Sequence, residues 1–134
     1  MLRKNAAAKN EGDVMSVLYI LSRILVAFFG VTTLLGVLWF AGSISKILTI
    51  AGVLLGLASL AAAFVPQRKL SSDTTRRTLV MLCAVGTGAG LILVADNFSA
   101  SNAIEWHVVM VNLLHVTAFT VIAARAFMWP TKPV

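Results

Sequence analysis

Apolar residues of this chain fall in four long blocks that are separated by short polar segments. A helix needs ~20 mostly apolar residues to cross the ~30 Å hydrocarbon core of a bilayer. Each block has roughly that length, so the pattern predicts four membrane-spanning helices. We place them at residues 17–40, 47–65, 78–95 and 104–128.

The polar segments between the blocks are too short to form a separate soluble domain. The pattern therefore predicts a polar tail at residues 1–13, a spanning domain at 14–130 and a terminal stub at 131–134. The first apolar block is too long for a signal peptide, and no convincing cleavage site follows it, so we expect it to stay as the first span. The expected fold class is an all-α integral membrane four-helix bundle.

Composition agrees with a membrane location. Of the 134 residues, 59% are hydrophobic and 12% are charged, whereas soluble domains carry about a quarter charged residues. The net charge is +6, but the basic residues flank the apolar blocks and form no basic-aromatic surface that would bind nucleic acid. We interpret them as determinants of topology that also attract anionic lipid headgroups.

The distribution of lysine and arginine predicts the orientation of the spans. With four spans, ten of the eleven basic residues lie on one side, and only Lys46 lies on the other. The positive-inside rule then places both termini and the middle loop in the cytoplasm. Arg23 can reach the headgroups by snorkelling. The predicted cytoplasmic residues next to the spans are Arg23, Arg68, Lys69, Arg76, Arg77 and Arg125.

Glycines spaced four residues apart indicate where helices pack closely. Gly52 and Gly56 share one face of the second span, and Gly86 and Gly90 share one face of the third. Small residues permit the close van der Waals contact that drives helix association in lipid. We expect spans two and three to approach each other through these faces, or to meet a symmetry-related copy.

The fourth span is the most polar, because it carries Asn112 and His115 together with Thr117 and Thr120. Such side chains form hydrogen bonds between membrane helices. Haem ligation and proton transfer are the alternatives for His115. His107 lies ~12 Å along the same helix and points ~80° away, so the two imidazoles cannot ligate one metal atom. We therefore expect no cofactor.

A polar cluster lies at the rim that the topology places outside. Asp96, Glu105 and His107 could together bind a divalent cation, but their spacing is not that of a metal site, and we interpret them as a solvated rim without metal. Cys83 is the only cysteine and lies in an apolar block, where a free thiol acts as a small hydrophobic side chain.

No catalytic motif or paired nucleophile and base occurs in the chain, so we expect no enzyme. The small size, minimal loops and small-residue faces favour a non-enzymatic subunit or accessory factor of a larger inner-membrane complex, whose partners are other membrane subunits or copies of itself. The alternatives are a small homo-oligomeric transporter or channel, and a haem-bearing electron-transfer subunit.

Overall fold

Four long helices form the described part of the protein, which in this computed structural model comprises residues 2–99 and 104–129. The helices are α1 (Leu2–Phe40), α2 (Lys46–Ala63), α3 (Asp73–Ser99) and α4 (Trp106–Phe127), and a short 3₁₀ helix, η1 (Gln67–Ser71), joins α2 to α3. Each long helix contains a segment long and apolar enough to cross a membrane. The predicted fold class, an all-α four-helix bundle, is therefore confirmed.

The helices extend beyond the apolar blocks at several ends. The backbone of α1 is helical from Leu2, so the predicted tail continues directly into the first span, whose membrane-length part is Asp13–Phe40. The α3 helix is likewise longer than the predicted range 78–95.

At the start of α2, the Ser45 side chain accepts a hydrogen bond from the Leu48 amide, which satisfies a free N–H group. The stub at residues 131–134 lies outside the described residues.

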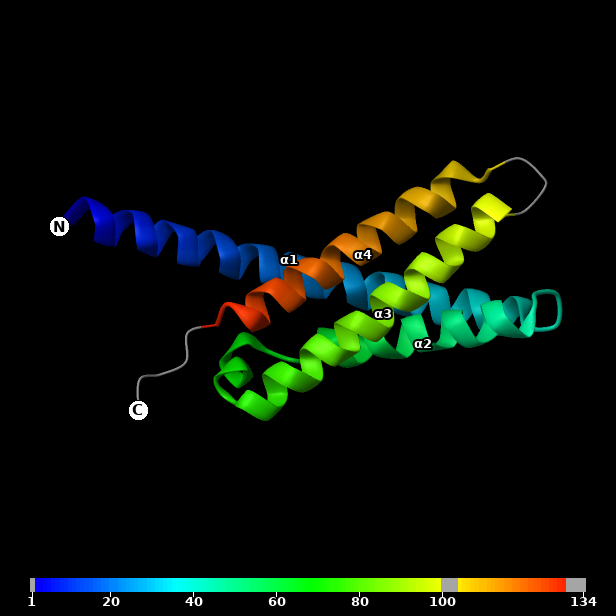
Figure 1. Ribbon diagram of the computed structural model, residues 1–134, viewed down its shortest axis with the longest axis horizontal. Coiled ribbons are helices and arrows are strands. Elements are labelled where there is room, and N and C mark those ends of the chain that lie inside the picture. Colours follow the sequence, from blue (N-terminus) through cyan, green and yellow to red (C-terminus); the bar gives the residue numbers. More distant parts are fainter. Residues whose placement is uncertain (1, 100–103, 130–134) are drawn as a thin grey trace.

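Neighbouring helices along the chain run in opposite directions and form two hairpins, α1–α2 and α3–α4 (Figure 1). Contacts join α1 to α2, α2 to α3, α3 to α4 and α4 back to α1. We call the end that holds η1, the start of α3 and the end of α4 the basic end. The opposite end, with the α1–α2 turn, the end of α3 and the start of α4, is the acidic end. The start of α1 and the end of α4 both point toward the basic end.

The α2 and α3 helices lie against each other as expected, but the two glycine pairs pack mainly against α1 and α4 and not against one another. A Cβ at Gly52 or Gly56 would overlap with Val37 or Leu34 of α1. A Cβ at Gly86 would overlap with the Phe119 ring of α4, and one at Gly90 would lie 3.2 Å from Val116 of α4. The glycines therefore tighten the packing within each hairpin, and α2 meets α3 mainly through other side chains.

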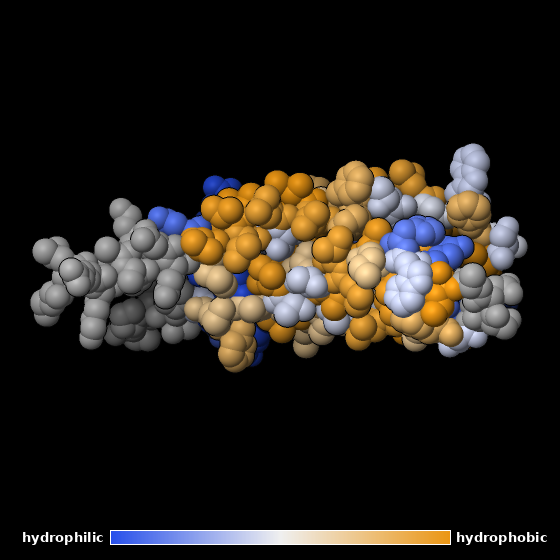
Figure 2. Space-filling view, turned by 90° about the horizontal axis from the view of Figure 1, so that it is seen from above, coloured by the Kyte–Doolittle hydropathy of each residue, from blue (hydrophilic) through white to orange (hydrophobic). Residues whose placement is uncertain are grey.

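The outer surface of the bundle is apolar over its middle. Large hydrophobic side chains are exposed on every helix, among them Phe28, Ile50, Met81 and Leu114. Figure 2 shows this apolar band on one face, with hydrophilic residues gathered nearer the two ends. Such a surface suits hydrocarbon rather than water, and the fold is that of a multi-pass membrane protein.

At the basic end, side chains from α1 pair with backbone carbonyls that the end of α2 leaves free. The Tyr19 hydroxyl donates to the Val65 carbonyl at 2.7 Å, and Arg23 Nε donates to the Ala63 carbonyl at 2.8 Å. The last carbonyls of a helix have no partner within the helix. Arg23, which the sequence suggested would reach for headgroups, thus uses one N–H group to cap α2.

Phe119 should make position 86 intolerant of any side chain, because its ring is fully buried against Gly86. We expect Gly86→Ala to lower the free energy of unfolding by about 1–3 kcal/mol, the usual effect of overpacking. Thermal unfolding of the purified protein in detergent measures the change.

Gly88→Ala is the matched control, since a Cβ at Gly88 would meet nothing within 4 Å. Its stability should be unchanged or slightly raised, because alanine favours a helix over glycine by up to ~1 kcal/mol. Equal stability of the two variants would contradict the packing described here.

Candidate functional site

A hydrogen bond between α2 and α4 lies inside the bundle. Ser59 Oγ and His115 Nε2 are 2.6 Å apart, and the two residues are 0% and 1% exposed. Ser59 Oγ also lies 2.6 Å from the Leu55 carbonyl of its own helix. A hydroxyl has one proton, so donation to Leu55 leaves Oγ to accept the Nε2–H of His115. This bond joins the α1–α2 hairpin to the α3–α4 hairpin.

Aromatic rings surround the imidazole of His115. Its plane stacks on the Phe119 ring, with centroids 5.0 Å apart and an interplanar angle of 8°, and the Phe29 ring of α1 lies 5.6 Å away. The α1 helix also packs closely against Ser59, because a Cβ at Gly30 would lie 2.7 Å from Ser59 Cβ. The imidazole is thus held by Ser59 on one side and by aromatic rings from α1 and α4.

The other polar side chains of α4 hydrogen-bond to their own helix. Asn112 Nδ2 donates to the Val108 carbonyl at 2.9 Å. Thr117 and Thr120 donate to carbonyls four residues earlier, at 2.8 and 2.9 Å. Of these polar residues, the structure therefore gives only His115 a side-chain hydrogen bond to another helix. Asn112, at 8% exposure, instead lines a cavity.

This cavity opens at the acidic end and has a volume of about 550 Å³. Thr33, Gly36 and Val37 of α1 form one wall, and α3 and α4 form the other. The polar side chains that line it are the hydroxyl of Thr33, the carboxylates of Asp96 and Glu105 and the amides of Asn97 and Asn112. Figure 1 shows the two hairpins diverging toward this end. Asn112 lies one helical turn from His115, so the cavity leads toward the Ser59–His115 pair.

The predicted rim cluster is only partly brought together. His107 Nε2 lies 3.7 Å from Glu105 Oε2, and both side chains are largely exposed. Asp96 shares the cavity with Glu105, and the Asn97 side chain accepts a hydrogen bond from the Glu105 amide at 3.1 Å. Within residues 2–99 and 104–129, no group of three His, Cys, Asp or Glu side chains has the geometry of a metal site.

The predicted basic residues gather at the basic end and divide into two kinds. Arg23, Arg76 and Arg125 bond to neighbouring helices or loops. The exposed ones are Arg68 and Lys69 on η1 and Arg77, which pairs with Asp73 of its own helix. Arg125 donates through Nε and Nη2 to Gln67 Oε1, at 3.4 and 3.3 Å, and its guanidinium lies over the Trp129 ring at 4.7 Å. These contacts tie the end of α4 to η1.

Sequence reasoning missed two residues that organise these contacts. Gln67 accepts from Ser16 of α1 as well as from Arg125, and Ser59 is the partner of His115. The only signal that the sequence gives for Gln67 is its place directly after Pro66, the residue that marks the end of α2. Ser59 lies in a run of alanines, where a lone hydroxyl inside a span could have suggested a polar partner.

Comparison with known proteins gives no relative: no family model, no curated protein and no solved structure matches this chain. The fold itself defines the class, a multi-pass membrane protein, by the four apolar helices of its described residues.

A double-mutant cycle tests the Ser59–His115 bond. We expect Ser59→Ala and His115→Phe to show a coupling energy of about 0.6–1.7 kcal/mol, the range measured for hydrogen bonds between membrane helices. Reversible unfolding of the two single variants and the double variant in mixed micelles gives this energy.

Thr117→Ala is the control partner in the cycle, because Thr117 is exposed and bonds to its own helix. Its coupling to Ser59→Ala should be near zero. If the His115 cycle also gave no coupling, the hydrogen bond between the hairpins would not exist in the folded protein.

Proposed function

We propose that this protein is a non-enzymatic subunit or accessory factor of a larger complex in an inner membrane, with its basic end in the cytoplasm. The observation that carries the proposal is an apolar groove of about 370 Å³ on the lipid-facing side of α2 and α3. Ala84 and Gly88 of α3 contribute small side chains to it, and Ile47, Ile50 and Leu54 of α2 form the facing wall.

Ala84 and Gly88 are exposed in this groove. A Cβ at Gly88 would meet nothing within 4 Å, in contrast to Gly86 and Gly90, which pack against α4. Glycine lowers helix stability by ~1 kcal/mol relative to alanine, so an exposed glycine brings no benefit to the chain alone. Ala84 and Gly88 are four residues apart and present the small-residue spacing that lets a second helix approach closely. The proposed occupant is a transmembrane helix of a partner subunit.

Filling the groove should prevent association with the partner. Gly88→Leu places a bulky side chain in the groove, so we expect it to abolish recovery of the partner subunit when the tagged protein is purified from its native membrane in mild detergent. Ala61→Leu is the matched control, because Ala61 is exposed on α2 and does not line the groove.

Photo-crosslinking from position 85, in the groove, identifies what lies there in the native membrane. A crosslink to another protein, lost in Gly88→Leu and kept in Ala61→Leu, is the expected result. Crosslinks to a second copy alone, with no other protein recovered, would contradict the role as a subunit of a larger complex and favour a homo-oligomer.

The cavity at the acidic end favours a second candidate function, a small homo-oligomeric transporter. The cavity is open at one end, while hydrogen bonds of Gln67 and Arg76 bridge the helices at the other. An opening on one side of the membrane is how a carrier exposes its binding site in one state of alternating access. Carboxylates of Asp96 and Glu105 at the mouth would favour a cationic cargo.

Flux measurements in liposomes separate the two functions. A transporter should lose cation flux in Asn112→Leu, which removes the amide inside the cavity, and should keep it in Thr117→Val, on the exposed side of α4. Wild-type protein that gives no cation flux above protein-free liposomes would reject the transporter and leave the subunit proposal unaffected.

A further inference from the structure

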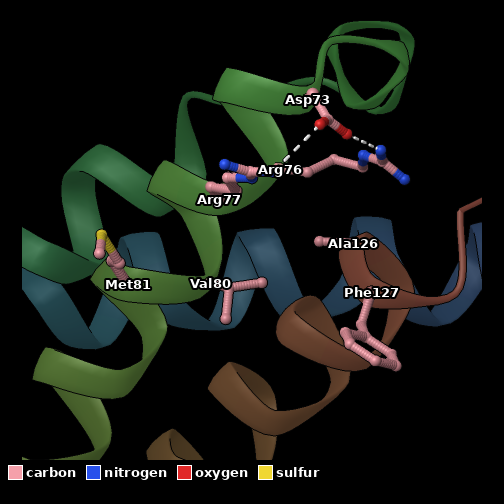
Figure 3. Close-up of a pocket in the computed structure, with 7 residues that line it drawn as sticks. All are labelled: Asp73, Arg76, Arg77, Val80, Met81, Ala126 and Phe127. Carbon is pink, nitrogen blue, oxygen red and sulfur yellow. Dashed lines mark hydrogen bonds and ion pairs between the residues drawn. The ribbon is translucent and has the colours of Figure 1, made fainter.

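A second pocket lies at the basic end, between the start of α3 and the end of α4, and has a volume of about 440 Å³. Figure 3 shows Asp73 at its rim with the guanidinium groups of Arg76 and Arg77 on either side. Below them the pocket is lined by Val80, Met81 and Phe127. A charged rim thus stands directly above an apolar wall.

The rim carries more positive charge than its own carboxylate neutralises. Arg76 Nη2 and Arg77 Nη2 both bond to Asp73, the latter at 3.5 Å. Two guanidinium groups therefore share one carboxylate, which leaves the rim with one net positive charge. The Arg77 side chain is 81% exposed, so its remaining N–H groups are available to an anion.

Arg76 is held in place more firmly than a surface arginine. Its side chain is 15% exposed, and Nη1 donates to the Trp129 carbonyl at 3.3 Å. Its Nε is the one buried side-chain nitrogen or oxygen that lacks a hydrogen-bond partner within the described part of the chain. These contacts hold the Arg76 guanidinium as a fixed positive charge beside the pocket, where it can form charge-assisted hydrogen bonds to an anion.

The apolar wall indicates which kind of anion fits. Met81 and Phe127 are 70% and 83% exposed, so the wall faces the hydrocarbon and not the centre of the bundle. A free phosphate ion would contact the arginines but would make no use of this wall. A phospholipid places its phosphate at the level of the rim and an acyl chain along the apolar residues below it.

The geometry points to a discrete binding site for an anionic phospholipid, with its phosphodiester held by Arg76 and Arg77 and an acyl chain against Val80, Met81 and Phe127. Basic pockets between transmembrane helices bind headgroups in this way. The site is separate from the α2–α3 groove and does not depend on the proposed function.

Native mass spectrometry of the full-length protein, released from detergent with added lipid, tests the site. Wild-type protein should retain one phosphatidylglycerol in preference to phosphatidylcholine. Replacing Arg76 and Arg77 together with glutamine should weaken this adduct by more than tenfold, and Arg77→Gln alone by about fivefold, which corresponds to ~1 kcal/mol for each basic group.

The matched control removes the same charge from the same end of the molecule. Arg68 and Lys69 are exposed on η1 and do not line the pocket, so replacing both with glutamine should leave the adduct unchanged. Equal losses in the two double variants would show diffuse charge attraction and overturn the site. Since Arg77 is exposed, Arg77→Gln provides a variant that folds even where the double substitution does not.

Soluble glycerol 3-phosphate distinguishes binding of the whole lipid from binding of its headgroup alone. At the concentration at which phosphatidylglycerol saturates the protein, glycerol 3-phosphate should neither bind nor displace the lipid. Binding as tight as that of the lipid would mean that the apolar wall plays no part, and the lipid assignment would be wrong.

Discussion

The close approach of Gly30 to Ser59 is the contact on which the rest of this bundle depends. Only a glycine fits there, because a Cβ at position 30 would lie 2.7 Å from Ser59 Cβ. With α1 and α2 this close, the Ser59 hydroxyl faces α4 and meets His115. The Ser59 hydroxyl donates to its own helix, whereas His115 finds its hydrogen-bond partner only at Ser59, because hydrocarbon offers none. The bond therefore helps to fix where the two hairpins cross. Beyond the crossing the hairpins diverge (Figure 1), and the cavity at the acidic end follows from that divergence.

The two ends of the bundle differ because their polar groups find partners in different ways. At the basic end, Tyr19 and Arg23 of α1 bond to carbonyls that α2 leaves free, and Gln67 of η1 receives Arg125 of α4. These bonds run between different segments and hold them together. At the acidic end, Asn112 bonds to its own helix, and Glu105 pairs locally with His107 and Asn97. Local pairing leaves the hairpins free to separate there.

The sequence predicts the helices well but says little about which faces meet. Hydropathy identified four spans because each must supply enough apolar residues to cross the hydrocarbon, and it placed the end of α2 correctly near Pro66. It missed the polar extensions of α1 and α3, since a helix continues past the bilayer wherever its backbone bonds permit. Glycine spacing showed that Gly52 and Gly86 lie on close-packed faces, but spacing along one helix cannot identify the partner helix. The same limit applies to His115: the need for a partner was visible, but Ser59 was not.

The α3 helix contributes to all three of the pockets and grooves described above. Its start carries Arg76 and Arg77 in the basic pocket, its middle carries Gly88 in the lipid-facing groove, and its end carries Asp96 in the acidic-end cavity. On its opposite face, Gly86 rests on Phe119, whose ring stacks on His115. The same helix that carries these three features thus also contacts the aromatic ring beside His115. The Ser59–His115 hydrogen bond, which joins α2 to α4, is therefore connected through Phe119 to the helix that carries all three features.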